Sequence, residues 1–504
     1  MEYIKEIFTY DPNAPMIFTR FFFWVFFAVV LTIYSVVYKK KPARNAYLLL
    51  VSSFFYYKSG GYFFIILVFT TLFDFAVGLW IQQAKTQGRK KLYLALSIIL
   101  NLGVLAYFKY SYFIIDSINN IFHSNLKVVN YLAFWTNGVA GTHLDITSII
   151  LPVGISFYTF QSISYTVSVY RKKVDALHNI LDYGCFVTFF PQLVAGPIVK
   201  AYDFIPQLYK DFSLSKKEFG FALFLILNGL IKKMLISDYI STNFVDRVFD
   251  SPMSYSGFEN LMAVYGYTIQ IYCDFSGYTD IAIGVALLLG FRLPVNFNSP
   301  YKAANITDFW HRWHISLSTW LRDYLYIPLG GNKKGKIRTY INLFLVMLIG
   351  GLWHGAAVRF IIWGGLHGLG LTLHKLWMKW FPAKEKISVW SKFWAAFITF
   401  HFVIFAWIFF RADSMRGVSS VLSQIFYHFN WQMIPEVIVS YKNVFSLILL
   451  AFLIHWLPVS TKEFYKNYFI KIPYLAKAMV VVLVVFILYQ VKSAEIQPFI
   501  YFQF

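Results

Sequence analysis

The sequence repeatedly contains apolar segments of about the length that crosses a lipid bilayer. A transmembrane helix needs about 20 predominantly apolar residues. Segments that reach or approach this length are 18–37, 63–81, 92–114, 149–169, 393–410, 444–457 and 476–489. The chain is 58% hydrophobic and only 14% charged, which is outside the range of soluble globular domains. These features predict an all-α polytopic membrane protein with about 11 to 13 membrane-embedded segments, counting both transmembrane and re-entrant helices.

The basic residues predict how the segments are oriented. They cluster between apolar runs, at 39–44, 85–91, 171–173, 333–338 and 375–392, whereas 116–145 and 417–441 are poor in Lys and Arg. The positive-inside rule places the basic loops in the cytoplasm and the N-terminus outside. This distribution explains the net charge of +21 without nucleic-acid binding. The first residues lack a basic region followed by a short apolar core, so we expect no cleaved signal peptide.

The chain is predicted to form a single membrane domain over residues 1–504. Helices in 1–115 and 393–504 would flank a middle part, 116–392, whose apolar runs are short and interrupted by Gly, Pro and charged residues. Irregular segments at membrane depth are tolerated where they are buried in protein or line a cavity. We therefore expect the chemistry in the middle part. The two cysteines, Cys185 and Cys273, lack metal-binding spacing, so no metal site is predicted.

Three features of the middle part lead to specific structural expectations. Two prolines and a glycine in the apolar stretch 189–197 predict a re-entrant turn. The capping-box pattern at 215–218 starts a helix that we expect Lys232 and Lys233 to interrupt. Asn305 and Asp308 cap a predicted helix over 307–326 at the cytoplasmic interface. Its aromatic face would carry Trp310, Trp313, Leu317, Trp320, Leu321 and Tyr324, and its other side His311, Arg312, Ser318, Arg322 and Asp323.

Two histidines in this part are candidate functional residues. His354 lies between apolar runs that begin near Tyr340 and Phe360, and an ionisable group inside a membrane is a functional-site hypothesis by default. We expect His354 at the turn of a helical hairpin, nearer the outer side. His314 lies beside Trp313, where a cavity could reach it from the cytoplasm; alternatively, it is a hydrogen-bonded packing residue.

Other polar residues in the apolar regions have more ordinary interpretations. His311, His367 and His374 are expected to be packing or interface residues. Asp274 and Asp280 are either ion-coupling carboxylates or a structural cap or bend near Gly277. These two alternatives bear directly on function, because coupling carboxylates are a feature of transporters.

A set of motifs resembles a known family. The sequences DFWHRWHISLSTWLRDY, over 308–324, and GLWHG, over 351–355, are similar to those of the membrane-bound O-acyltransferase family. The resemblance is greatest to its bacterial branch of alginate O-acetylation and teichoic acid D-alanyl transfer proteins. Supporting motifs lie at 151–158, 196–198, 228–233 and 274–278, and PLGGN at 328–332 favours the alginate-type branch. The motifs follow the family's order over about 150–370.

The resemblance implies a ring of transmembrane helices around a thinned centre, with a cytoplasmic funnel and an extracytoplasmic opening joined by a tunnel. It also implies that His354 is the catalytic histidine and that His314 is its partner across the tunnel. In the alginate-type branch, a separate periplasmic esterase-like protein is expected to complete the transfer. The chain has no G-x-S-x-G motif of its own, which argues against an internal serine acyl-enzyme.

Together these observations predict an O-acyltransferase, most simply an acetyltransferase, in the bacterial cytoplasmic membrane. The donor would be a cytoplasmic thioester, either acetyl-CoA or an acyl-carrier-protein thioester, with no resident cofactor. The acceptor would be a hydroxyl of an extracytoplasmic polysaccharide or of a partner protein. His354 would act as general base and His314 would orient the acyl carbonyl or help expel the thiolate. The predicted substrate-binding residues are Trp310, Arg312, Trp313, Ser318, Asp323 and Trp353.

A transporter or flippase for a lipid-linked sugar is the alternative function. Broken helices and buried carboxylates are features that transporters share. Histidines at both mouths of one site suit proton transfer better than ion coupling, which favours the enzyme.

Overall fold

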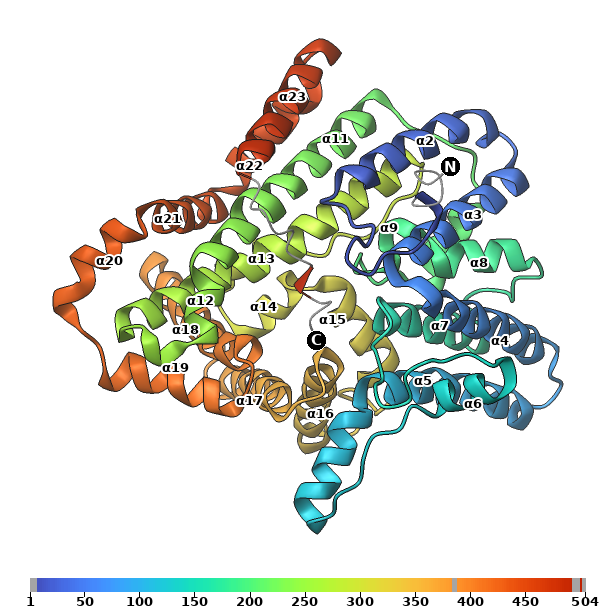
Figure 1. The fold of residues 1–504 in the computed structure, drawn as a ribbon, viewed down its shortest axis with the longest axis horizontal. Coiled ribbons are helices and arrows are strands. Elements are labelled where there is room, and N and C mark those ends of the chain that lie inside the picture. The colour runs from blue at the N-terminus through green and yellow to red at the C-terminus, as the bar shows by residue number, and fades with distance from the viewer. Residues whose placement is uncertain (1–6, 383–387, 492–498, 501–504) are drawn as a thin grey trace.

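The computed structural model describes residues 7–382, 388–491 and 499–500, and every regular element in these ranges is helical. The N-terminal elements are α2 (Phe21–Val37), α3 (Lys41–Gly60), α4 (Phe64–Gln83), α5 (Gln87–Phe122), α6 (Tyr131–Ala140), α7 (Ile155–Tyr170), α8 (Ile180–Thr188), α9 (Phe190–Leu193) and α10 (Ala201–Leu208). Figure 1 shows that α2 to α9 form one side of the molecule. Helix α7 packs against both α4 and α5, and α8 packs against α3.

The remaining helices complete the other side and the centre of the molecule. They are α11 (Lys216–Leu230), α12 (Asp246–Asp250), α13 (Gly257–Leu288), α14 (Ile306–Arg312), α15 (Ile315–Leu321), α16 (Lys336–His354), α17 (Val358–Trp380), α18 (Val389–Arg411), α19 (Met415–Tyr427), α20 (Ile434–Ser440), α21 (Lys442–Trp456), α22 (Val459–Lys471) and α23 (Tyr474–Val491). In Figure 1 the short helices α14 and α15 lie in the middle, with longer helices around them.

The membrane-spanning helices confirm the prediction of a polytopic membrane protein. Seven helical stretches of the described chain are long and apolar enough to cross a bilayer: 41–83, 87–122, 216–250, 257–288, 336–354, 389–411 and 474–491. An eighth crossing is reached if the pair 431–440 and 442–456, bent by 88°, counts as one span. The other apolar segments form shorter helices, such as α2 with 17 residues, or lie buried in the interior, as α7 does.

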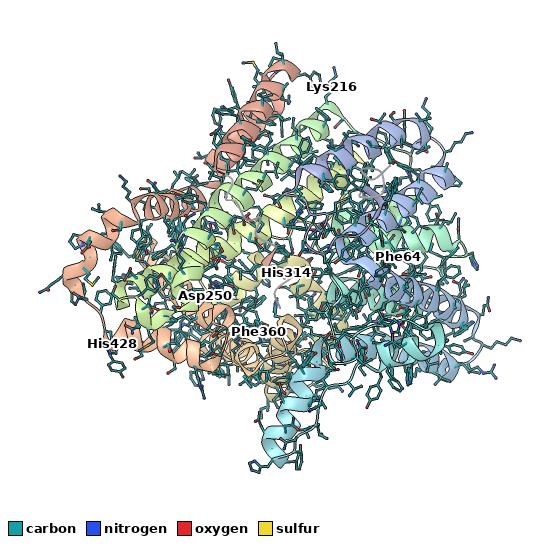
Figure 2. All side chains as sticks on the ribbon, viewed as in Figure 1. Phe64, Lys216, Asp250, His314, Phe360 and His428 are labelled. Atoms are coloured by element: carbon teal, nitrogen blue, oxygen red, sulfur yellow. The ribbon has the colours of Figure 1, made fainter. Side chains whose placement is uncertain are left out.

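The helix that begins at the capping box is longer than expected. Ser215 and Glu218 form the reciprocal cap, as predicted. The chain does not break at Lys232 and Lys233, however, because a π-helical segment, η2 (Ile231–Asp238), continues α11 toward Asp250. The two ammonium groups are accommodated by carboxylates of α13, which lies alongside. Figure 2 labels both ends of this stretch, Lys216 and Asp250.

Asp274 and Asp280 each pair with a lysine of η2, and the cap or bend predicted near Gly277 is wrong. Lys232 Nζ lies 2.7 Å from an Asp280 oxygen, and Lys233 Nζ lies 2.5 Å from an Asp274 oxygen. Helix α13 passes through Gly277 without a bend or cap, over 32 residues. Burying charges is tolerable when they are paired in this way. The pairs hold α13 against α11 and η2 inside the membrane.

The predicted single helix over 307–326 is wrong, because it breaks at its centre. Helix α14 ends at Arg312, Trp313 is extended, and His314 has the left-handed backbone angles φ 42° and ψ 56° before α15 begins. A π-helical turn, η6 (Arg322–Tyr326), follows. His314 is fully buried inside the protein. Because of this break, the His314 side chain points in a different direction from that of a residue at the same position in a continuous helix.

The hairpin of α16 and α17 is confirmed, and glycines allow its two helices to touch. A Cβ atom at Gly351 would lie 2.2 Å from the Phe360 carbonyl oxygen, and one at Gly364 would lie 2.3 Å from the Met347 carbonyl oxygen. Only glycine permits this approach of the two backbones. The contact fixes the end of α16, where His354 is the last helical residue.

Candidate active site

His354 lies in an aromatic enclosure at the end of α16. Its side chain is nearly fully buried, with 3% of the residue exposed. The ring centroids of Trp353, Trp363 and Phe410 lie 4.9, 5.1 and 5.3 Å from that of the imidazole. These rings come from α16, α17 and α18. Most of the imidazole surface is therefore in contact with aromatic rings.

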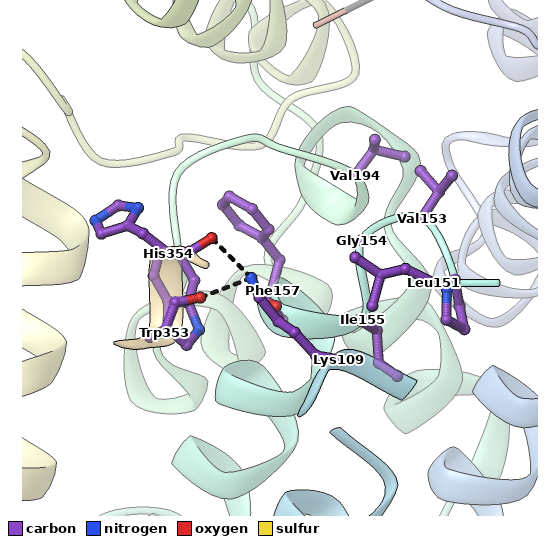
Figure 3. A pocket seen from close by; sticks show the side chains of 11 residues that line it. Lys109, Leu151, Val153, Gly154, Ile155, Phe157, Val194, Trp353 and His354 are labelled. Carbon is purple, nitrogen blue, oxygen red and sulfur yellow. Dashed lines mark hydrogen bonds between the residues drawn. The ribbon is translucent and has the colours of Figure 1, made fainter. Parts of the chain in front are cut away.

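The backbone of His354 faces a different group of residues from its ring. Lys109 Nζ, from α5, donates hydrogen bonds to the carbonyl oxygens of Trp353, at 2.7 Å, and His354, at 2.9 Å. Figure 3 shows the ammonium between these carbonyls and the imidazole pointing away from it. A cavity of about 50 Å³ lies here, lined by Lys109, residues 151–157, Val194, Trp353 and His354. That is room for one or two water molecules.

His314 is held at its strained position by Asn296, which lies in the loop between α13 and α14. The Asn296 Oδ1 atom lies 3.2 Å from His314 Nδ1, and it accepts from the Ser316 backbone N–H at 3.0 Å and the Ser316 hydroxyl at 2.9 Å. The Ser316 oxygen in turn accepts from the Ile198 N–H. Figure 2 places His314 near the centre of the molecule.

This network assigns the tautomer of His314. A backbone N–H can only donate, so the Asn296 atom facing the Ser316 N–H is the amide oxygen rather than the nitrogen. An amide oxygen only accepts, so the Nδ1 atom of His314 carries the proton in the contact with it. The neutral ring then has its lone pair on Nε2. In this tautomer Nε2 accepts a hydrogen bond and does not donate one.

Trp353 connects the two histidines. Its ring centroid lies 4.9 Å from that of His354 and 6.3 Å from that of His314. The two imidazoles belong to segments 40 positions apart in the sequence, yet they pack against one indole. The ring centroid of Phe275, from α13, lies 4.6 Å from that of His314. The two predicted catalytic residues therefore lie in one interior site.

The predicted tryptophans form a continuous aromatic wall beside this site. Trp310 lies 5.9 Å from Trp363, which in turn contacts His354 and lies 5.9 Å from Trp407. Trp313 lies 5.0 Å from Trp407. The structure thus brings Trp310, Trp313 and Trp353 together with both histidines.

The polar residues of the predicted substrate-binding set lie elsewhere and have local partners. Arg312 forms an ion pair with Asp308 at 2.8 Å, and Ser318 donates to the Trp313 carbonyl. Asp323 accepts from Lys200 at 2.6 Å and from Arg322 at 2.8 Å. Partial burial raises the pKa of the Asp323 carboxyl, but hydrogen bonds from Arg322 and Lys200 outweigh it and hold the pKa below its usual value.

No cluster of three or more His, Cys, Asp or Glu side chains in the described part of the chain could hold a metal ion.

The site's motifs match a known family. The sequence model of the membrane-bound O-acyltransferase family matches residues 172–422, which include both histidines and the aromatic wall. The probable alginate O-acetylase AlgI of Pseudomonas aeruginosa is 41% identical over 366 residues, covering 72% of this chain and 66% of that protein. The peptidoglycan O-acetyltransferase of Helicobacter pylori is 40% identical over 386 residues, covering 70% of this chain and 68% of that protein.

The chain belongs to the membrane-bound O-acyltransferase family.

A less similar relative is the teichoic acid D-alanyltransferase of Bacillus subtilis, which is 33% identical over 274 residues, covering 51% of this chain and 68% of that protein. The matched segments thus span about two thirds of the length of each of these relatives. Membership confirms the predicted resemblance and, at the level of the family, the prediction of an O-acyltransferase enzyme in a membrane.

Several residues around the two histidines were not among the predicted site residues. Lys109 carries a charge within the apolar run 92–114, and that signal was available. Asn296 lies in an unremarkable polar loop, so nothing local marked it. Trp363 and His367 lie one turn apart on α17, and their rings are 4.7 Å apart. Among the described residues, neither ring nitrogen of His367 has a hydrogen-bond partner.

Proposed function

We propose that the chain transfers an acyl group, most simply acetyl, from a cytoplasmic thioester to a hydroxyl on the outer side of the membrane. The observation that carries this proposal is the convergence of His314 and His354 on Trp353 inside the protein. Two buried imidazoles in a family of acyltransferases supply a base for a hydroxyl nucleophile. Relatives named alginate and peptidoglycan O-acetylases support acetyl as the group and an envelope polymer as the acceptor.

In this reaction His354 is the general base. Burying an isolated charge is costly, so the enclosed imidazole favours the neutral form, which can accept a proton. The hydroxyl oxygen attacks the thioester carbonyl while His354 takes the hydroxyl proton. The C–S bond then breaks, and the proton passes from the His354 imidazolium, by way of His314 Nε2, to the departing thiolate. The products are an ester and a thiol, and general-base catalysis of this kind contributes roughly 10² to 10⁴-fold.

His314 has a role that depends on its protonation. The Asn296 contact places its lone pair on Nε2, so the neutral ring is a hydrogen-bond acceptor toward a thiol or hydroxyl. It would donate to an acyl carbonyl only after Nε2 gains a proton. We therefore assign His314 to the proton's path toward the leaving thiolate rather than to polarising the ground-state carbonyl.

The surroundings of the site assign roles to the other predicted residues. Trp310, Trp313 and Trp353 supply the apolar wall along which an acyl chain or pantetheine arm would lie. Arg312, together with the basic loop at 333–338, would attract a phosphate-bearing donor from the cytoplasm. Ser318 and Asp323 would shape the same approach. Acetyl-CoA and an acyl-carrier-protein thioester are both suitable donors.

The acceptor is a hydroxyl of an extracytoplasmic polysaccharide, reached directly or through a serine of a periplasmic esterase-like partner. Residues 1–504 would work as one unit in the bacterial cytoplasmic membrane. The pairing of Asp274 and Asp280 with lysines favours the enzyme over the transporter alternative, because both carboxylates already have cationic partners in the protein.

The test uses purified protein in inside-out vesicles supplied with radiolabelled acetyl-CoA. Label should be released from the thioester and recovered as ester on a hydroxyl acceptor with the wild type, and His354→Ala should reduce the rate by at least about 10²-fold. His428→Ala, at an exposed histidine, is the matched control and should retain the wild-type rate. Transfer that does not depend on His354 would refute the assignment of the base.

A further inference from the structure

The end of α16 is capped by two neighbouring residues of a distant helix. The last four carbonyl groups of an α-helix have no partner within the helix. Here Tyr110 donates its hydroxyl to the Leu352 carbonyl at 2.8 Å, and Lys109 donates to the next two carbonyls, those of Trp353 and His354. Three consecutive carbonyls are thus satisfied by adjacent side chains of α5, more than 240 positions earlier in the chain.

The charge of Lys109 is used at this helix end rather than in an ion pair. Among the described residues, no carboxylate forms a salt bridge with it. Cations are favourable near the C-terminus of a helix, where the backbone dipole is negative. The ammonium also lies 6.0 Å from the centre of the Trp353 ring, the indole that both histidines contact.

The cap acts on the backbone whose position determines the aim of the imidazole. His354 is the last residue of α16, and Gly355 and Ala357 after it are extended. A terminal helical residue frays unless its carbonyls are held. Lys109 contacts the carbonyl side of His354, and the imidazole points away from it (Figure 3). The imidazole contacts the rings of Trp363 and Phe410. The lysine therefore does not touch the atoms that react.

We propose that Lys109, assisted by Tyr110, is a positioning residue that holds the terminal turn of α16 and thereby aims the His354 imidazole at the acceptor hydroxyl. This inference rests on the proposed function for its catalytic consequence, whereas the cap itself is a structural relationship. A misplacement of about 1 Å at a catalytic group can cost about 10²-fold in rate. Losing the cap should therefore lower turnover far more than it lowers donor affinity.

The chain offers a matched control. Lys462 Nζ donates to the His455 carbonyl at 2.7 Å, at the C-terminal end of α21, so it caps a helix that does not carry His354. Lys109→Met and Lys462→Met make the same chemical change at two helix ends. Lys109→Arg keeps a cation with several donors, and Tyr110→Phe removes only one of the three capping bonds.

The experiment measures acetyl transfer and hydrogen exchange on the same purified proteins. Lys109→Met should lower kcat by about 10 to 100-fold while the KM for acetyl-CoA stays within about twofold. Lys109→Arg should recover most of the loss, Tyr110→Phe should lose less than Lys109→Met, and Lys462→Met should keep the wild-type kcat. Hydrogen exchange of the backbone amides of 350–356, measured by mass spectrometry, should be faster in Lys109→Met than in the wild type. In Lys462→Met it should equal that of the wild type.

The outcomes separate this inference from the proposed function. No His354-dependent transfer in the wild type refutes the proposed function, and the exchange of 350–356 then still tests the cap. With an active wild type, normal kcat and normal exchange in Lys109→Met overturn the inference alone. The inference is also overturned if Lys109→Met and Lys462→Met both show a lower kcat, a higher KM and a lower thermal stability to a similar extent. That result would show only general destabilisation. If Lys109→Met does not fold, Lys109→Arg and Tyr110→Phe carry the same comparison.

Discussion

The Oδ1 atom of Asn296 lies 3.2 Å from Nδ1 of His314 and joins the loop before α14 to the break between α14 and α15. His314 has a positive φ angle, a conformation that costs free energy for a non-glycine residue. The Asn296 oxygen also accepts two hydrogen bonds from Ser316, so one buried amide holds both the strained backbone and the ring. Backbone geometry and tautomer are thereby set together.

Asn296→Leu should reduce both stability and turnover. The substitution removes the oxygen that faces three donors: the Nδ1–H of His314 and the backbone N–H and hydroxyl of Ser316. Leaving these buried donors without a partner should lower the free energy of unfolding by about 1–3 kcal/mol. The Nδ1 proton of His314 also loses its partner, so kcat should fall by about 10-fold or more. Ser316→Ala is the control, because it costs stability while leaving the amide contact with His314 in place. Equal kcat losses in the two variants would contradict the tautomer argument.

Breaking one ion pair inside the membrane should be costly, and replacing the whole pair should cost less. Lys232→Met leaves Asp280 without its cation and should lower the free energy of unfolding by about 3 kcal/mol. Lys232→Met with Asp280→Leu should recover most of that loss and keep acetyl transfer within about threefold, since we assign the pair a structural role. Unfolding in mixed micelles and the transfer assay measure the two quantities.

The exposed pair of Lys41 and Asp211 is the comparison for that prediction. Its carboxyl side chain is 91% exposed, so Lys41→Met should change stability by less than about 1 kcal/mol. If the double replacement at Lys232 and Asp280 abolished acetyl transfer in a folded protein, the structural role would be wrong, and the pair would have a role in the reaction itself.

Asp323 should make stability depend on pH at the acidic end. Its pKa is lowered in the folded protein, so its pairing stabilises the fold above the unfolded value of about 3.9 and is lost as pH falls through the lower folded pKa. At neutral pH the thermal unfolding midpoint of Asp323→Asn should lie below that of the wild type. The difference between the two midpoints should become smaller below about pH 4. In a Lys200→Met background, Asp323→Asn should change the unfolding midpoint less at neutral pH than it does in the wild type. A difference between the midpoints of the wild type and Asp323→Asn that grew as the pH fell would contradict the direction of the pKa shift.

Gly351→Ala should disturb the hairpin that carries His354. The added Cβ would meet the Phe360 carbonyl oxygen at 2.2 Å, which forces α16 and α17 apart, and we expect a loss of about 1–3 kcal/mol in stability together with reduced turnover. Gly365→Ala is the matched control on α17, because its Cβ would have its nearest neighbour, Phe344, at 3.9 Å. Similar losses in both variants would argue against a special role for the close approach at Gly351.

Hydropathy and spacing predicted much of the fold and part of the site. The apolar runs at 63–81, 92–114 and 393–410 correspond to α4, α5 and α18, and the hairpin ending at His354 was placed correctly. Helix continuity was predicted less well. Lys232 and Lys233 looked like an interruption because carboxylates of α13, about 40 to 50 positions away, were not visible as their partners.

At His314 the sequence led to the opposite error, because a continuous helix was predicted where the structure has a break. Residues 307–326 have a helical pattern of aromatic side chains, and most of that face is buried as expected. The local pattern nevertheless did not reveal the left-handed residue in its middle, because Asn296 stabilises that conformation from another segment. Periodicity reports which face of a segment is apolar, and it does not report where tertiary hydrogen bonds override the helix.

The sequence by itself determined that this chain is a polytopic helical membrane protein, which motifs carry the family resemblance, and that His314 and His354 are the candidate catalytic pair. Those conclusions depend on hydropathy, charge and short motifs, which are local properties. Only the tertiary structure decided that both rings meet at Trp353, that Asn296 sets the tautomer of His314, and that Lys109 caps the helix ending at His354. The physical reason is that buried polar groups and helix ends must find hydrogen-bond partners, and in this protein residues far away in the chain provide them.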